Sequence, residues 1–152
     1  MKIKTSELTG HALNWAVAQA EGDKVYRPRL GRPCNWDKEA YLKDGSDDRW
    51  VVRVQNPKVG HFVDWTYNPS GAWMQGGPII EREEIELTID RAGETDTLWR
   101  SEMFDIKGVS IAHEYGPTPL IAAMRCFVAS RLGDEVDVPD DVLSDMELDT
   151  LI

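Results

Sequence analysis

The sequence has few cysteines and no long apolar run. Its two cysteines, Cys34 and Cys126, lack the CxxC spacing of zinc and redox motifs, so two free thiols in a reducing compartment are the simpler interpretation. No apolar stretch approaches the ~18 residues of a membrane span, and no hydrophobic segment follows Lys2 and Lys4. We therefore expect no membrane partner and a protein that stays in the cytoplasm.

Positive charge is missing from the C-terminal segment. Residues 134–152 carry eight of the 27 acidic residues and no Lys or Arg, which leaves 19 acids against 17 bases elsewhere. A body this close to neutral argues against duplex nucleic acid as a partner, because duplex binding draws much of its affinity from a basic face. The acidic run is typical of a solvated terminus, although docking on a basic partner or nucleic-acid mimicry would use the same charge. We predict one domain over residues 1–138 and an acidic tail over 139–152.

Residue patterns typical of catalysis or metal binding are also missing. The three histidines, His11, His61 and His113, form no HExxH or HxH pattern, and no serine stands in a GxSxG elbow. The acidic segment 81–84 has the groups to hold a magnesium ion, but acids flanking a strand more often stand in solvent. We therefore predict a protein that is not an enzyme and needs no metal or cofactor.

The apolar periodicity predicts an α+β fold with a mostly antiparallel sheet. Helical spacing predicts an N-terminal helix over residues 9–20 and a C-terminal helix over 119–132, the second capped by Thr118. The second helix is apolar on nearly all sides, so either its own sheet wraps it or another subunit shares it. We predict a homo-oligomer on this ground. Strands are expected at 50–54, 62–67, 85–90, 98–104 and 109–113, the first four as two hairpins.

Two segments rich in glycine and proline predict long ordered loops. Residues 23–48 show no apolar period, and residues 68–78 combine Gly76-Gly77 with two prolines that each remove a backbone donor. We expect no regular structure in residues 68–78.

The same two segments offer the parts of a nucleotide pocket. Arginine guanidinium groups can form paired hydrogen bonds with phosphate, aromatic rings can stack on a base, and glycine lets a ligand come close to the backbone amides. Gly76-Gly77 lacks the lysine of a Walker loop, so a tight turn is its ordinary interpretation, and capping explains Thr118 as well as anion binding does. The candidate ligand-binding set is Arg27, Arg32, Trp36, Tyr67, Trp73, Gln75, Gly76, Gly77 and Thr118.

Three blocks of the sequence resemble the phage and prophage NinX-like family, whose domain carries an unknown-function label. They are Lys4–Gly10 followed by Leu13–Ala18, the segment Tyr67–Glu81, and Gly116–Ser130. Together they reach across most of residues 1–138. The resemblance implies a phage accessory protein that acts in the cytoplasm of an infected bacterium.

Small phage accessory proteins without catalytic groups often act by stoichiometric binding. By analogy of role, we expect a sponge: a homo-oligomer that sequesters a nucleotide-derived host immune signal, either an ADP-ribose derivative or a cyclic dinucleotide. The alternative is a protein-interaction module that binds a host or phage replication or recombination protein. An enzyme that cleaves the same signal comes third, because such hydrolysis normally needs a metal or a general base.

Overall fold

The computed structural model describes residues 1–21, 68–91, 98–140 and 142–143, together with the backbone of strands at 42–43, 50–55 and 62–66. The chain divides into two compact units. The first consists of Met1–Val17 and Asn68–Ile152, and the second consists of Ala18–Tyr67. In sequence, the second unit is thus an insertion in the first.

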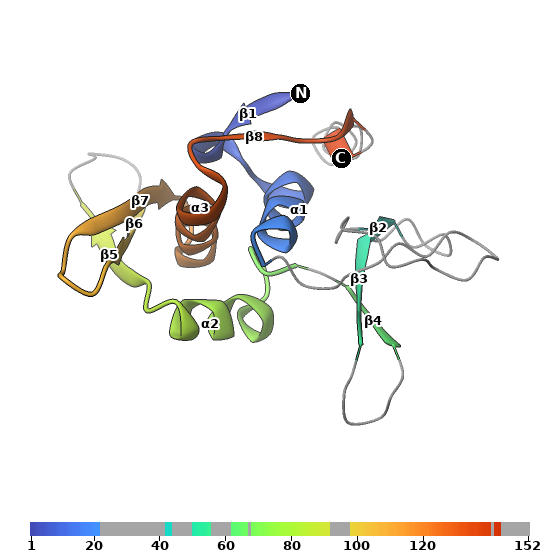
Figure 1. Cartoon of the computed structure of the whole chain (residues 1–152), viewed down its shortest axis with the longest axis horizontal. Coiled ribbons are helices and arrows are strands. Elements are labelled where there is room, and N and C mark those ends of the chain that lie inside the picture. Colours follow the sequence, from blue (N-terminus) through green and yellow to red (C-terminus); the bar gives the residue numbers. More distant parts are fainter. Residues whose placement is uncertain are drawn as a thin grey trace. The chain divides into compact units, whose positions relative to one another are not determined.

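The first unit is an α+β structure, which confirms the predicted fold class. The sheet β5-β6-β7 is antiparallel, and the first strand, β1, pairs with β8, the strand that follows α3 (Figure 1). Both predicted helices and the second hairpin are present. The elements are β1 (Lys2–Lys4), the 3-10 turn η1 (Thr5–Glu7), α1 (Gly10–Glu21), α2 (Trp73–Arg82), β5 (Glu86–Asp90), β6 (Leu98–Phe104), β7 (Ser110–Gly116), α3 (Pro119–Leu132) and β8 (Glu135–Asp137).

The second unit contains a three-stranded antiparallel sheet. Its strands are β2 (Leu42–Lys43), β3 (Trp50–Gln55) and β4 (Phe62–Thr66), in the order β2-β3-β4. The pairing of β3 with β4 confirms the hairpin predicted from the apolar runs at 50–54 and 62–67.

A helix stands where the sequence predicts a loop. Residues 68–72 form a turn, but α2 begins at Trp73 and includes Gly76, Gly77 and Pro78. The prediction is wrong for residues 73–78 because packing outweighs propensity. Gly76 and Ile79 are buried along one side of the helix, and Pro78 removes a single N–H donor from a ladder that continues on both sides of it.

The apolar helix α3 is wrapped by its own unit. Its buried residues are Leu120 and the unbroken run from Ala122 to Val128, and it contacts β5, β6, β7, α2, η1 and β8. Thr118 Oγ1 accepts a hydrogen bond from Ile121 N at 3.1 Å and Pro119 follows, as predicted for the start of this helix. The sequence left two explanations for a helix that is apolar on nearly all sides, burial within its own chain or contact with another subunit. The structure shows burial within one chain.

Polar groups inside this core are paired. The Arg125 side chain donates from Nε to Leu8 O at 2.9 Å and from Nη1 to Tyr115 O at 2.8 Å, which ties the segment after η1 to the end of β7. Burial lowers the pKa of Arg125 and raises the pKa of Glu114, and the charge of each opposes the shift of the other. The hydrogen bonds offset part of the cost of burying this guanidinium.

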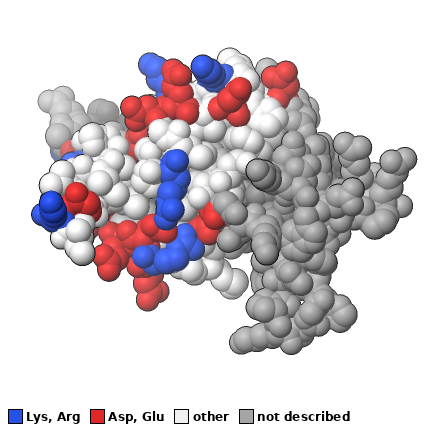
Figure 2. Space-filling view, viewed as in Figure 1, with Lys and Arg blue, Asp and Glu red and all other residues white. Residues whose placement is uncertain are grey.

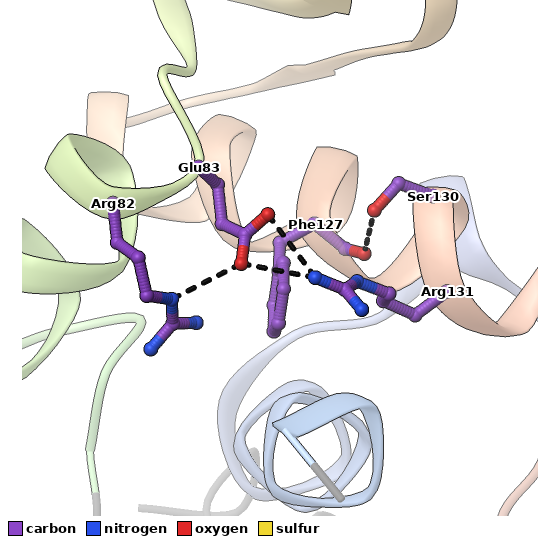
Figure 3. Close-up of polar contacts among 5 residues, drawn as sticks. All are labelled: Arg82, Glu83, Phe127, Ser130 and Arg131. Atoms are coloured by element: carbon purple, nitrogen blue, oxygen red, sulfur yellow. Dashed lines mark hydrogen bonds and ion pairs between the residues drawn. The ribbon is translucent and has the colours of Figure 1, made fainter. Parts of the chain in front are cut away.

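The C-terminal ends of α2 and α3 meet around Phe127 (Figure 3). Glu83 accepts hydrogen bonds from Arg82 Nε at 3.0 Å and from Arg131 Nη2 at 3.0 and 3.2 Å. The two guanidinium carbons lie 5.8 and 5.6 Å from the centroid of the Phe127 ring, within cation–π range. Glu83 is thus engaged by two arginines, and no cluster of three His, Cys, Asp or Glu side chains suited to a metal occurs among the described residues.

Candidate functional site

Five of the nine predicted ligand-binding residues lie in the described part of the chain. Arg27, Arg32, Trp36 and Tyr67 lie outside the described residues. The other five fall on the first half of α2 or at the start of α3, and they are Trp73, Gln75, Gly76, Gly77 and Thr118. The structure brings two of them, Trp73 and Thr118, to one surface feature.

That feature is a hollow of about 300 Å³ between the N-terminal ends of α2 and α3, which we call the α2–α3 hollow. The Trp73 side chain is 57% exposed. An indole that keeps this much of its ring in solvent at the wall of a hollow can stack on a planar ligand. The lining residues are Ser70, Gly71, Trp73, Thr118, Pro119, Leu120 and Ile121.

The two helices present their N-terminal ends to this hollow. Gly76 of α2 lies against Leu120 of α3, close to the first turn of both helices. Helix dipoles and first-turn N–H groups favour negative charge at such ends. Thr118 serves α3 as an ordinary cap, whereas Ala72 at the N-cap of α2 provides no side-chain cap. The seven lining residues include no Lys or Arg, so this preference comes from the backbone.

A hydrogen-bonded turn that sequence reasoning missed holds one wall of the hollow. Asn14 Oδ1 accepts hydrogen bonds from Ser70 N at 3.0 Å and Ser70 Oγ at 2.7 Å, and Asn14 Nδ2 donates to Asn68 Oδ1 at 3.0 Å. Gln75 Oε1 accepts from Asn68 N at 2.7 Å, so this side chain helps to fix the turn. The one signal in the sequence was that all four residues fall within the family blocks.

Gly76 and Gly77 have different surroundings. A Cβ atom on Gly76 would collide with Pro69 O and would lie 2.6 Å from Leu120 Cδ2, whereas a Cβ atom on Gly77 would meet nothing within 4 Å. The absence of a side chain at Gly76 therefore lets α2 approach both the turn and α3. The space beside Gly77 is open.

A second exposed feature is the apolar tip of the β6–β7 hairpin. Asp105 Oδ1 accepts hydrogen bonds from Lys107 N and Val109 N, both at 2.9 Å, and Gly108 completes the tight turn with a φ of 78°. The fully exposed Ile106 stands in this turn. The apolar hairpin tip consists of the exposed residues Phe104, Ile106, Val109 and Ile111.

Charge is mixed on the face of the described residues that Figure 2 shows. On the face shown in Figure 2, Lys and Arg side chains lie among Asp and Glu side chains and do not gather into one basic patch. This arrangement fits the near balance of acids and bases outside the C-terminal segment.

Comparison with known protein families assigns the chain. Residues 4–131 match the family described as Bacteriophage P22, NinX. The chain belongs to this family. The NinX match confirms the resemblance of the three sequence blocks, while a search among curated proteins found no match.

The NinX match covers every residue of the α2–α3 hollow and of the Asn14 hydrogen bonds, and it stops before β8. Among the described residues, no helix is long and apolar enough to cross a membrane.

Proposed function

We propose that this NinX family member is a non-catalytic phage accessory protein that sequesters a nucleotide-derived host immune signal in the cytoplasm of the infected bacterium. The ligand would be an ADP-ribose derivative or a cyclic dinucleotide. The observation that carries the proposal is the exposed Trp73 indole beside a hollow that faces two helix N-termini. The indole would stack on a base, and first-turn N–H groups would meet phosphate oxygens.

The size of the hollow limits how much of such a ligand it can hold. Pockets for drug-sized ligands span about 300–1,000 Å³, so about 300 Å³ fits one part of a dinucleotide and not the whole molecule. The remaining part needs other groups. The part that Arg27, Arg32, Trp36 and Tyr67 play in binding stays a prediction from the sequence, because these residues belong to the second unit and lie outside the described residues.

Recovery of the ligand tests this function directly. Purified protein is incubated with ADP-ribose or a cyclic dinucleotide, the free ligand is measured, and the protein is then denatured by heat. A sponge depletes the ligand and returns it intact, whereas an enzyme returns product. A protein-interaction module never depletes the ligand, and that result for every nucleotide tried would overturn the proposal.

Two substitutions locate the site on α2. Stacking contributes roughly 1–3 kcal/mol per base, so Trp73→Ala should weaken binding by about tenfold or more in calorimetry. Met74→Ala is the matched control, because Met74 is the neighbouring residue, is mostly exposed and does not line the hollow. Equal losses in both variants would move the site elsewhere.

The alternative function, a module that binds a replication or recombination protein, is favoured by the apolar hairpin tip. A rigid turn that displays a fully exposed isoleucine is typical of a contact surface. The proposed homo-oligomer would need a surface of the same kind, because α3 is buried within one chain. The Ile106→Asp variant separates the functions: a sponge keeps its ligand affinity per chain, whereas an interaction module loses its partner.

A further inference from the structure

Asn14 is a buried polar side chain whose hydrogen bonds all reach one distant segment. It lies on α1 and is 3% exposed, and its three hydrogen bonds go to Asn68 and Ser70, more than fifty residues along the chain. A polar group buried this far costs stability unless it is fully paired, and this one is paired at both ends of its carboxamide. The pairing attaches the turn before α2 to α1.

The residue type at position 14 follows from its partners. Ser70 N can only donate, so the Asn14 atom that faces it must be the oxygen. The amide nitrogen then faces Asn68 and donates to Oδ1. Leucine, which has the same branched shape but no polar group, would leave Ser70 N and the Asn68 carboxamide without these partners.

Asn68, which Asn14 holds in place, contacts the residues that form one wall of the hollow. Asn68 O accepts hydrogen bonds from Gly71 N at 3.1 Å and Ala72 N at 2.8 Å, directly before Trp73. The Asn68 carboxamide also lies against Gly71, where an added Cβ would stand 2.6 Å from Nδ2 and 2.9 Å from Oδ1. Ser70, Gly71 and Trp73 all line the hollow, so the place of the carboxamide sets the place of that wall.

We infer that Asn14 is a positioning residue for the ligand: it does not line the hollow, but it holds the Asn68–Ala72 turn and thereby orients Trp73 for stacking. This inference rests on the proposed function as far as the ligand is concerned. The orientation of Trp73 can be measured without any ligand, so the positioning role of Asn14 can be tested separately from the proposed nucleotide binding.

The experiment uses the full chain labelled with 5-fluorotryptophan and read by fluorine NMR, with the Trp73 resonance assigned from Trp73→Phe. Asn14→Leu should shift or broaden that resonance and weaken ADP-ribose binding by about tenfold. Gly71→Ala should shift or broaden the same resonance and weaken binding as well, because its methyl group would displace the Asn68 side chain. The Gly71→Ala variant keeps the test available if Asn14→Leu does not fold.

Asn14→Asp separates positioning from a merely structural role. The carboxylate still accepts from Ser70 N, and the Asn68 amide can turn to donate to it, so Trp73 should stay in place. A buried charge should nevertheless lower the melting temperature. Ser130→Ala is the matched control, because it removes a partly buried hydrogen bond, from Ser130 Oγ to Phe127 O, outside the hollow and should leave Trp73 unchanged.

Two outcomes would decide against the inference. One is an unchanged Trp73 resonance in both Asn14→Leu and Gly71→Ala. The other is a shift in Asn14→Asp and Ser130→Ala as large as in Asn14→Leu, since loss of stability would then explain it. If wild type binds no ADP-ribose, the proposed function fails for that ligand, and the resonances still decide the role of Asn14.

Discussion

The backbone of Gly76 lies close to Pro69 O and Leu120, while the space beside Gly77 is open. No local pattern distinguishes the two residues, because Leu120 comes from a helix more than forty positions later in the chain. The sequence could therefore predict that the pair is conformationally special, but not that one glycine serves packing and the other does not. The same limit applies to Asn14, whose partners lie on a different segment.

Paired substitutions test this difference between the glycines. Gly76→Ala should destabilise the protein by about 1–3 kcal/mol or more, because its methyl group meets a backbone oxygen that cannot move cheaply. Gly77→Ala should stabilise it by about 0.5–1 kcal/mol through helix propensity. Urea unfolding of both variants measures the contrast, and equal effects would show that the close approach at Gly76 is not tight.

The buried thiol of Cys126 makes stability depend on pH in alkali. Burial raises the pKa of Cys126 from 9.0 to about 11. Between these values the unfolded chain loses the proton while the folded chain keeps it, so stability should fall as pH rises from about 9 to 11, by about 2–3 kcal/mol in total. The measurement compares Cys34→Ser with Cys34→Ser/Cys126→Ala at several pH values. Parallel curves would mean that the Cys126 thiol does not titrate as described.

Helix α2 is an element that the spacing of apolar residues does not predict. The hairpins and the two outer helices were predicted because their apolar spacing is regular over many residues. The segment that forms α2 has two glycines and a proline in its middle, and its helical state depends on contacts with the turn and with α3. The α2–α3 hollow could not be predicted for the same reason, although Trp73 and Thr118 were both singled out.

The ion pair between α2 and α3 should add little to stability. Arg131 is about half exposed, and exposed ion pairs contribute roughly 0.2–1 kcal/mol. A double-mutant cycle with Glu83→Gln and Arg131→Gln should give a coupling energy in that range that shrinks in high salt. By contrast, Phe127→Ala should cost about 3–5 kcal/mol, because that ring is 1% exposed. A coupling energy of several kcal/mol would show that the pair in Figure 3 is shielded from solvent.

At the scale of the whole molecule, apolar burial continues past β8 into the predicted acidic tail. Val138 is fully buried, Val142 is 2% exposed, and Leu143 is half-buried. Val142→Ala should therefore cost about 1–3 kcal/mol, and Leu143→Ala should cost less. Thermal melts of both variants check this ranking. An unchanged melt for Val142→Ala would support the purely solvated tail expected from composition.

Self-association, if the proposed homo-oligomer forms, cannot use the face of α3 that suggested it. Phe127 and its neighbours are buried inside one chain, so Phe127→Asp should unfold the protein and not yield a folded monomer. Among the described residues, the apolar hairpin tip offers an exposed contact surface, and Ile106→Asp should leave each chain folded because that side chain is fully exposed in the single chain. Sedimentation velocity at micromolar concentration should then show an oligomer for wild type and a monomer for Ile106→Asp. A monomeric wild type would remove the oligomer from the proposal, and an oligomer that survives Ile106→Asp would place the contact on another surface.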